Sequence, residues 1–198
     1  MVENLVFHGP GEPSQLVASV IKSNLEILPL SEIAYKISDA YIRHERKAPI
    51  LEYLKRNMGN EIEYIVGFAQ VHVVPRIELQ VHSLHPKVAS GSLIGSRRIA
   101  WADVTRPLDK FNHTTLASAL FEHQGVQALK EVIDAGLLQV RGTSLKGYTH
   151  ERTRYVALHI ESNPCAADIL YINFFPHDLP NCGICARPLA CTSVQKPS

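Results

Sequence analysis

Apolar and polar positions repeat with a helical period in the first third of the chain. Over residues 15–27 and 33–41 apolar side chains recur every three or four positions, which is the spacing of one face of an α-helix. Ser14 and Ser31 stand ahead of these segments, and we expect them to act as N-caps. A third helix is expected over residues 50–58, between Pro49 and Gly59. The pattern therefore predicts two or three N-terminal helices that pack on a core.

From Glu61 the period changes from helical to alternating. This change predicts two strands, over residues 62–74 and 76–83, joined through Pro75. A Gly/Ser-rich segment at 91–98 is expected to form a turn that ends in Arg97 and Arg98, followed by a strand over 99–104. Backbone amides and guanidinium groups in such a turn would suit a phosphate, and an ordinary surface turn is the alternative.

The segment from 114 to 160 predicts a pair of helices and then two strands. The helices are expected over 116–121 and 127–135, with a stop at Gly136, and the strands over 137–141 and 154–160. A polar turn at 142–152 separates the two strands. This order resembles a winged helix, which implies a nucleic-acid-binding or regulatory module. Gln127 and Lys130 would then lie on the helix that reads DNA.

The last apolar segment, residues 168–175, is rich in β-formers and predicts a buried strand. Taken together, the elements predict an α+β fold with N-terminal helices, a mixed or antiparallel sheet and a central helical pair. We see no linker, so residues 1–191 are expected to form one globular domain. Residues 192–198 are polar and are expected to be a frayed C-terminal tail.

Composition narrows the class of protein. Of the 198 residues, 45% are hydrophobic and 20% are charged, which is typical of a folded globular domain. The formal net charge is only +1, so the charge as a whole favours neither nucleic acid nor an anionic membrane as a partner. No segment has the length and apolarity of a membrane helix, and the N-terminus lacks the pattern of a secretory signal. We therefore expect a cytoplasmic protein.

All four cysteines lie near the C-terminus, at Cys165, Cys182, Cys185 and Cys191. So tight a cluster does not form a disulfide framework for a chain of this length, and we expect the thiols to be reduced. Reduced thiols that are close together suggest a metal site or redox chemistry.

The order of motifs in this region is His159-Ile160-Glu161, an apolar strand, a proline-rich turn and Cys182-Gly183-Ile184-Cys185. It resembles the zinc-dependent deaminases of cytosine and adenine, in particular the divergent members found in toxins. The resemblance implies that His159, Cys182 and Cys185 hold Zn²⁺ and that the metal activates a water molecule. It also implies that Glu161 moves the proton from that water to the ring and to the leaving ammonia. The implied substrate is a nucleobase or a related small molecule.

Three other interpretations of the same residues remain open. Zinc could be structural and fasten the C-terminus through the cysteine thiolates. Alternatively, the cysteines could bind nothing and serve as small buried hydrophobes or free thiols. A separate metal site could form if His72, His82 and His85 converge from neighbouring strands. The first two interpretations belong to a non-catalytic binding or regulatory protein.

Overall fold

The computed structural model describes residues 5–11, 13–55, 57–58, 61–62, 64–84, 93–101, 115–142, 150, 152–175 and 182–188. The described helices are α1 (Pro13–Lys22), α2 (Leu30–Ile42), α3 (Pro49–Leu54) and α5 (Thr115–Asp134). The described strands are β1 (Val6–Gly11), β2 (Leu25–Ile27), β3 (Asn57–Met58), β4 (Glu61–Ile62), β5 (Tyr64–Val74), β6 (Glu78–Leu84), β7 (Leu93–Ala100), β8 (Leu138–Gly142), β9 (Arg152–Glu161), β10 (Asp168–Phe175) and β11 (Cys182–Pro188). The predicted α+β fold is confirmed.

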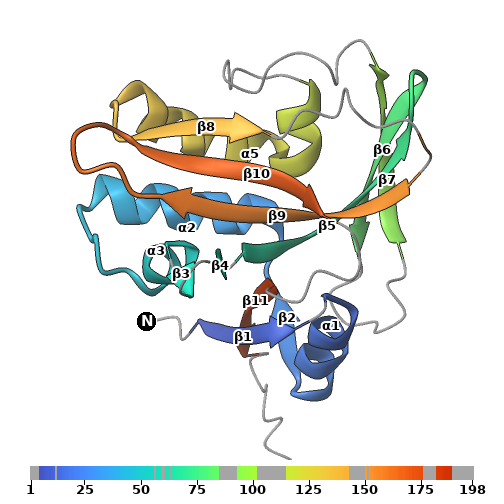
Figure 1. Cartoon of the computed structure of the whole chain (residues 1–198), viewed down its shortest axis with the longest axis horizontal. Helices are drawn as coiled ribbons and strands as arrows, with labels where there is room; N and C mark the ends of the chain where they lie inside the picture. Colours follow the sequence, from blue (N-terminus) through green and yellow to red (C-terminus); the bar gives the residue numbers. More distant parts are fainter. Residues whose placement is uncertain are drawn as a thin grey trace, which may run out of the picture.

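Most of the strands join in one mixed sheet with the order β1-β11-β5-β9-β10-β8. Strand β6 pairs with β5 and continues to β7, and β2 pairs with β11. The pairs β11/β5 and β10/β8 are parallel, whereas β5/β9 and β9/β10 are antiparallel. The long strands β5 and β9 therefore lie in the middle of this order, and β10 lies between β9 and the short strand β8 (Figure 1).

Helices α2 and α5 cover one face of this sheet, behind β8, β10 and β9 in the view of Figure 1. Their apolar faces form the main core with alternate residues of the strands, such as Leu158 and Ile160 of β9. Tyr155 belongs to a second cluster, in which Ile184 and Ala186 pack against apolar residues of α1. Because successive side chains of a strand point to opposite faces, the two clusters lie on opposite sides of the sheet.

Helix α5 is broken at Glu122, whose φ of 57° and ψ of 175° are not helical. The second half of the helix packs closely on α2. A Cβ atom added at Gly125 would lie 2.9 Å from the Cα of Ser31 and 3.1 Å from the Cβ of Phe121. Only glycine allows the two backbones to approach so closely.

Several predicted helix boundaries are wrong. Helix α1 ends at Lys22 rather than at residue 27, because Asn24 adopts a left-handed conformation and Leu25–Ile27 pairs with β11. Ser31 is not an N-cap: it lies inside α2, where Pro29 takes the N-cap position without a side-chain hydrogen bond. Helix α3 ends at Leu54 instead of continuing to residue 58. For α1, pairing of Leu25–Ile27 with the distant strand β11 overrides the local helical pattern.

The predicted turn at residues 91–98 is also wrong for the part that the structure describes. Residues 93–98 belong to strand β7, which pairs in register with β6. Arg97 donates a hydrogen bond to the carbonyl of Ser118, and Arg98 lies 3.9 Å from the carboxylate of Glu78. These arginines therefore extend from a strand and contact protein groups, so they do not form the predicted phosphate turn.

The winged-helix prediction fails on topology. A wing requires that the two strands on either side of its turn pair with each other, but β8 and β9 are not neighbours. Strand β10 lies between them, parallel to β8 and antiparallel to β9. Leu129 and Val132 of this segment are nevertheless buried in the main core.

Other predictions are confirmed. The alternation from Glu61 predicted two strands here, and the structure has them as β5 and β6, which pair antiparallel. Strand β10 has the predicted bounds, residues 168–175. Among the described helices, none is long and apolar enough to cross a membrane. The predicted tail at residues 192–198 lies outside the described residues.

The contact at Gly125 leads to a prediction about stability. We expect Gly125→Ala to lower the free energy of unfolding by about 1–2 kcal/mol, because the added methyl group meets backbone that cannot rotate away. This loss should appear even though alanine is the better helix former. Urea denaturation would measure it. Gln124→Ala, at the exposed neighbouring position, should change stability little. Equal stability of the two variants would show that α2 and α5 have room to separate.

Candidate functional site: a cavity at the C-terminal end of helix α2

His159 and Glu161 lie on β9, on the face of the sheet opposite the main core. The His159 side chain is only 5% exposed and stacks on Tyr171 of β10, with ring centroids 6.4 Å apart. The Tyr171 hydroxyl donates a 2.9 Å hydrogen bond to the Glu161 carboxylate, which is exposed to solvent. This bond raises the pKa of Tyr171 above its ordinary value. Glu161, at the end of β9, is thus hydrogen-bonded to a neutral phenol of the neighbouring strand.

The two cysteines of the Cys-x-x-Cys motif lie on strand β11, whereas the metal hypothesis assumed a turn between them. Cys185 is fully buried in the main core, together with Leu158 and Ile160. His159 alternates with these two residues of β9, so it points to the opposite face. Strand β5 also separates β9 from β11, which places their backbones about 10 Å apart, at two strand spacings. The structure therefore does not bring His159 and Cys185 together.

Among the residues that the structure describes, no group of three or more His, Cys, Asp or Glu side chains is placed to hold a metal ion. Cys165 is exposed in the turn between β9 and β10, and Cys191 lies outside the described residues. His72 and His82 are on the paired strands β5 and β6, opposite Gln80 and Gln70, and His85 is not among the described residues. Zinc binding therefore stays a prediction, both at the cysteines and at the histidines.

Packing gives a second explanation for the Cys-Gly-Ile-Cys sequence. A Cβ atom at Gly183 would lie 1.6 Å from the hydroxyl oxygen of Tyr53, so only glycine leaves room for this buried side chain. The Tyr53 ring stacks on Phe7, with centroids 4.4 Å apart. Phe7 in turn pairs with Cys185 in the β1/β11 ladder. Gly183 and Cys185 thus fasten α3 and β1 to the sheet.

A cavity of about 440 Å³ lies at the C-terminal end of α2. Its wall combines the ends of α2 and α3, the turn after α5 and the turn between β9 and β10, segments that are far apart in the sequence. The lining residues are Ala40, Tyr41, His44, Arg46, Leu51, Lys55, Gly136, Leu137, Ser162, Asn163, Pro164, Ala166, Ala167 and Asp168. Its size is that of a pocket for a small molecule.

Asp168 is the centre of the polar side of this cavity. Its Oδ2 atom accepts hydrogen bonds from the Lys55 ammonium at 2.6 Å and from the Tyr41 hydroxyl at 2.7 Å. Its Oδ1 atom accepts a bond from the backbone N–H of Asn163 at 3.0 Å. The Lys55 Nζ atom also lies 5.5 Å from the centre of the Tyr41 ring, within the range of a cation–π contact. Helices α2 and α3 are thereby tied to the β9–β10 turn.

These contacts fix the charge of each group at neutral pH. Burial alone would raise the pKa of Asp168, but the hydrogen bonds from Lys55, Tyr41 and Asn163 outweigh it and hold the pKa below its ordinary value. Burial, and then the bond to the Asp168 carboxylate, raise the pKa of Tyr41 well above its ordinary value. Tyr41 therefore stays a neutral donor, and Asp168 stays a carboxylate paired with Lys55.

The cavity wall has more positive than negative charge. Among the described residues that line the cavity, Asp168 is the only carboxylate, whereas Lys55 and Arg46 are both cations, and His44 adds charge when it is protonated. The positive charge of Arg46 slightly opposes the rise in the pKa of Tyr41. The ends of α2 and α5 are capped by backbone N–H groups, such as those of Glu45 and Leu137. The cations are therefore not needed as helix caps.

Sequence analysis did not identify this site. In the sequence, Tyr41 falls on the apolar face of a predicted helix, and Asp168 begins a predicted buried strand. Lys55 belongs to no recognisable motif. The pairs Tyr41–Asp168 and Lys55–Asp168 join positions 127 and 113 residues apart, and no local pattern indicates such contacts. The one available signal was an acidic residue at the head of an otherwise apolar strand, which must find a partner when it is buried.

Comparison with known proteins adds no assignment, since no family model, curated protein or solved structure matches the chain. The functional argument therefore depends on the geometry of the described residues.

The Asp168 cluster predicts a dependence of stability on pH. We expect Asp168→Asn to lower the free energy of unfolding by about 2 kcal/mol at pH 7, because it removes a charged partner of Lys55. The pKa of Asp168 is lower in the folded state than in the unfolded state. The contribution of Asp168 to the free energy of unfolding is therefore complete above the unfolded pKa of about 3.9 and is lost as the pH falls through the folded pKa. Denaturation curves from pH 7 to pH 2.5 would follow the difference between the two proteins.

A matched control is Asp134→Asn, which removes the exposed partner of Lys130 on α5. Surface pairs contribute little, so this variant should change stability by less than about 0.5 kcal/mol at any pH. A similar small effect for Asp168→Asn would show that the cavity cluster is energetically equivalent to a surface pair.

The positions of the thiols predict how they react. Cys165 should react with a thiol reagent in the native protein, whereas Cys185 should react only after denaturation, because it is fully buried. Mass spectrometry of the labelled peptides, with and without a chelator, would separate burial from metal protection. The zinc hypothesis predicts about one zinc per chain and chelator-dependent protection of Cys182 and Cys185. Protection that survives the chelator would leave burial as its cause.

Proposed function

We propose that the protein binds a small organic anion in the cavity at the C-terminal end of α2. The observation that carries this proposal is the excess of positive charge among the described residues of the cavity wall, which include two cations, Lys55 and Arg46, and one carboxylate, Asp168. A ligand with one negative charge would balance Arg46 while the pair of Lys55 and Asp168 stays intact.

The protonation states support binding rather than catalysis. A general base needs a pKa near the working pH, and neither Tyr41 nor Asp168 meets this condition. Tyr41 holds its proton because its pKa is raised, and Asp168 is weakly basic because its pKa is lowered. The Lys55 ammonium lies 2.6 Å from Asp168 and has further N–H groups that can donate to a ligand. A fixed cation with free donors is a property of an anion-binding site.

The apolar side of the cavity indicates that the rest of the ligand is apolar. Apolar side chains of the wall come from all four segments that form it, and they include Ala40, Leu51, Leu137 and Pro164. A ligand that fills about 440 Å³ would bury a small apolar body against them. The cavity is therefore matched to a carboxylate or a phosphate ester with an apolar group, and a bare inorganic ion would use only the polar side.

The zinc-dependent deaminase remains a separate prediction. Neither His159 nor Glu161 lines this cavity, and Cys185 is buried in the core. A deaminase would require rearrangement of β9 and β11 to form its metal site, whereas anion binding uses side chains where they already lie. For this reason we favour the binding function.

Isothermal titration with a charged and a neutral ligand of the same shape would test the proposal. We expect benzoate and phenyl phosphate to bind more tightly than benzamide, which lacks the charge, and more tightly than inorganic phosphate, which lacks the ring. Arg46→Gln should weaken the binding of benzoate at least fivefold and leave the binding of benzamide unchanged, because it removes the cation that the ligand balances. Added salt should weaken the binding of the two organic anions.

Arg43→Gln is the matched control, since Arg43 is one turn away, is exposed and pairs with Asp39 outside the cavity. It should leave the binding of every ligand unchanged. Equal binding of benzoate and benzamide, or equal losses in the two arginine variants, would contradict an anion site at this cavity.

A further inference from the structure

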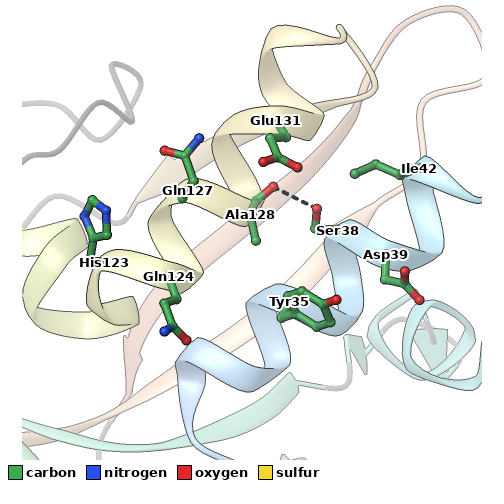
Figure 2. A pocket seen from close by; sticks show the side chains of 9 residues that line it. All are labelled: Tyr35, Ser38, Asp39, Ile42, His123, Gln124, Gln127, Ala128 and Glu131. Atoms are coloured by element: carbon green, nitrogen blue, oxygen red, sulfur yellow. Dashed lines mark hydrogen bonds between the residues drawn. The ribbon is translucent and has the colours of Figure 1, made fainter.

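A second hollow, of about 390 Å³, lies between α2 and the second half of α5. Figure 2 shows the side chains that line it, with those of α2 on one wall and those of α5 on the other. They are Tyr35, Ser38, Asp39, Ile42, His123, Gln124, Gln127, Ala128 and Glu131, and we call this hollow the α2–α5 groove.

The groove is rigid because its two walls are joined at the base. The Ser38 hydroxyl is buried and donates a 2.8 Å hydrogen bond to the carbonyl of Ala128, which Figure 2 marks with a dashed line. Near the start of α2, the close contact of Gly125 with Ser31 holds the helices together. A partner would therefore meet a preformed surface, and little conformational entropy would be lost in shaping it.

Two large apolar side chains are exposed at this groove. Tyr35 is 62% exposed and Ile42 is 49% exposed, and in the described part of the chain only Ile77, in the turn between β5 and β6, is comparable. Single exposed hydrophobic residues are normal, but two that line one groove indicate a contact surface. They are seven positions apart on α2, which is a rise of about 10 Å.

The charge of the groove is negative. Asp39 and Glu131 contribute carboxylates, and no lysine or arginine is among the described residues that line it. Asp39 is paired with Arg43 at 2.7 Å, whereas Glu131 on the opposite wall has no cation beside it among the lining residues. A partner with lysine or arginine next to its apolar anchors would complement this surface.

Both walls of the groove are helices, and this restricts the partner's backbone. A partner in extended conformation needs a free strand edge to satisfy its N–H and C=O groups, and the groove walls offer none. A helix satisfies its own backbone and can lay apolar residues one or two turns apart between Tyr35 and Ile42. The acidic surface disfavours nucleic acid, and two copies of the same groove would repel each other.

We propose that the α2–α5 groove docks a basic amphipathic helix of a partner protein. Apolar residues on one face of that helix contact Tyr35 and Ile42, and its basic residues lie near Asp39 and Glu131. This interaction is independent of the anion cavity, which is lined by other residues of α2 and lies at its C-terminal end.

A display library of 16-residue amphipathic helices, with randomised charge at the flanking positions, would test the proposal on the full chain. We expect the selected peptides to have a net positive charge and to bind less tightly as salt increases. Ile42→Glu should weaken the binding of the selected peptides at least tenfold, because it places a charge at an apolar contact. Glu131→Lys should weaken their binding at least threefold and favour acidic peptides instead.

The matched control is Ile77→Glu, which changes an even more exposed isoleucine outside the groove and should leave peptide binding unchanged. Circular dichroism would verify that each variant is folded. Selection of acidic or uncharged peptides, failure to select any helix, or equal losses for Ile42→Glu and Ile77→Glu would overturn the proposal. Concentration-dependent dimerisation that Ile42→Glu abolishes would also overturn it, because the groove would then hold a second copy of this chain.

Discussion

The close contact between α2 and α5 is the constraint on which the rest of this structure depends. Gly125 brings the two backbones together at Ser31, and the buried bond from Ser38 to Ala128 closes the same seam. On the inner side the paired helices form the main core against β9 and β10. The outer side of the same pair leaves a groove, and the C-terminal end of α2 leaves a cavity. One helix contact thus positions the core and both candidate sites.

Burial of Asp168 is the second constraint, because a carboxylate that leaves water must be paired and hydrogen-bonded. The chain meets this requirement with groups from three separate segments, namely Tyr41, Lys55 and the backbone of Asn163. The same contacts hold each group in one protonation state. A site built in this way is suited to recognising charge, whereas proton transfer needs groups that can change their state near neutral pH.

The cysteine-rich stretch shows how one sequence pattern supports two interpretations. Cys-x-x-Cys binds a metal when a turn directs both sulfur atoms to the same side. In this protein the motif lies on a strand whose alternation places Cys185 in the core, away from the face that bears His159. Gly183 has a packing role, because it makes room for Tyr53.

The sequence by itself determined those features that depend on local periodicity. It predicted helix α2, the two strands β5 and β6, the bounds of β10 and the α+β class, because hydrophobic spacing reports which face of an element is buried. Only the tertiary structure decided that Leu25–Ile27 is a strand, that β10 separates β8 from β9, and that Tyr41 and Lys55 meet Asp168. These features arise from pairing between residues far apart in the chain, whose free energy exceeds the weak local preference.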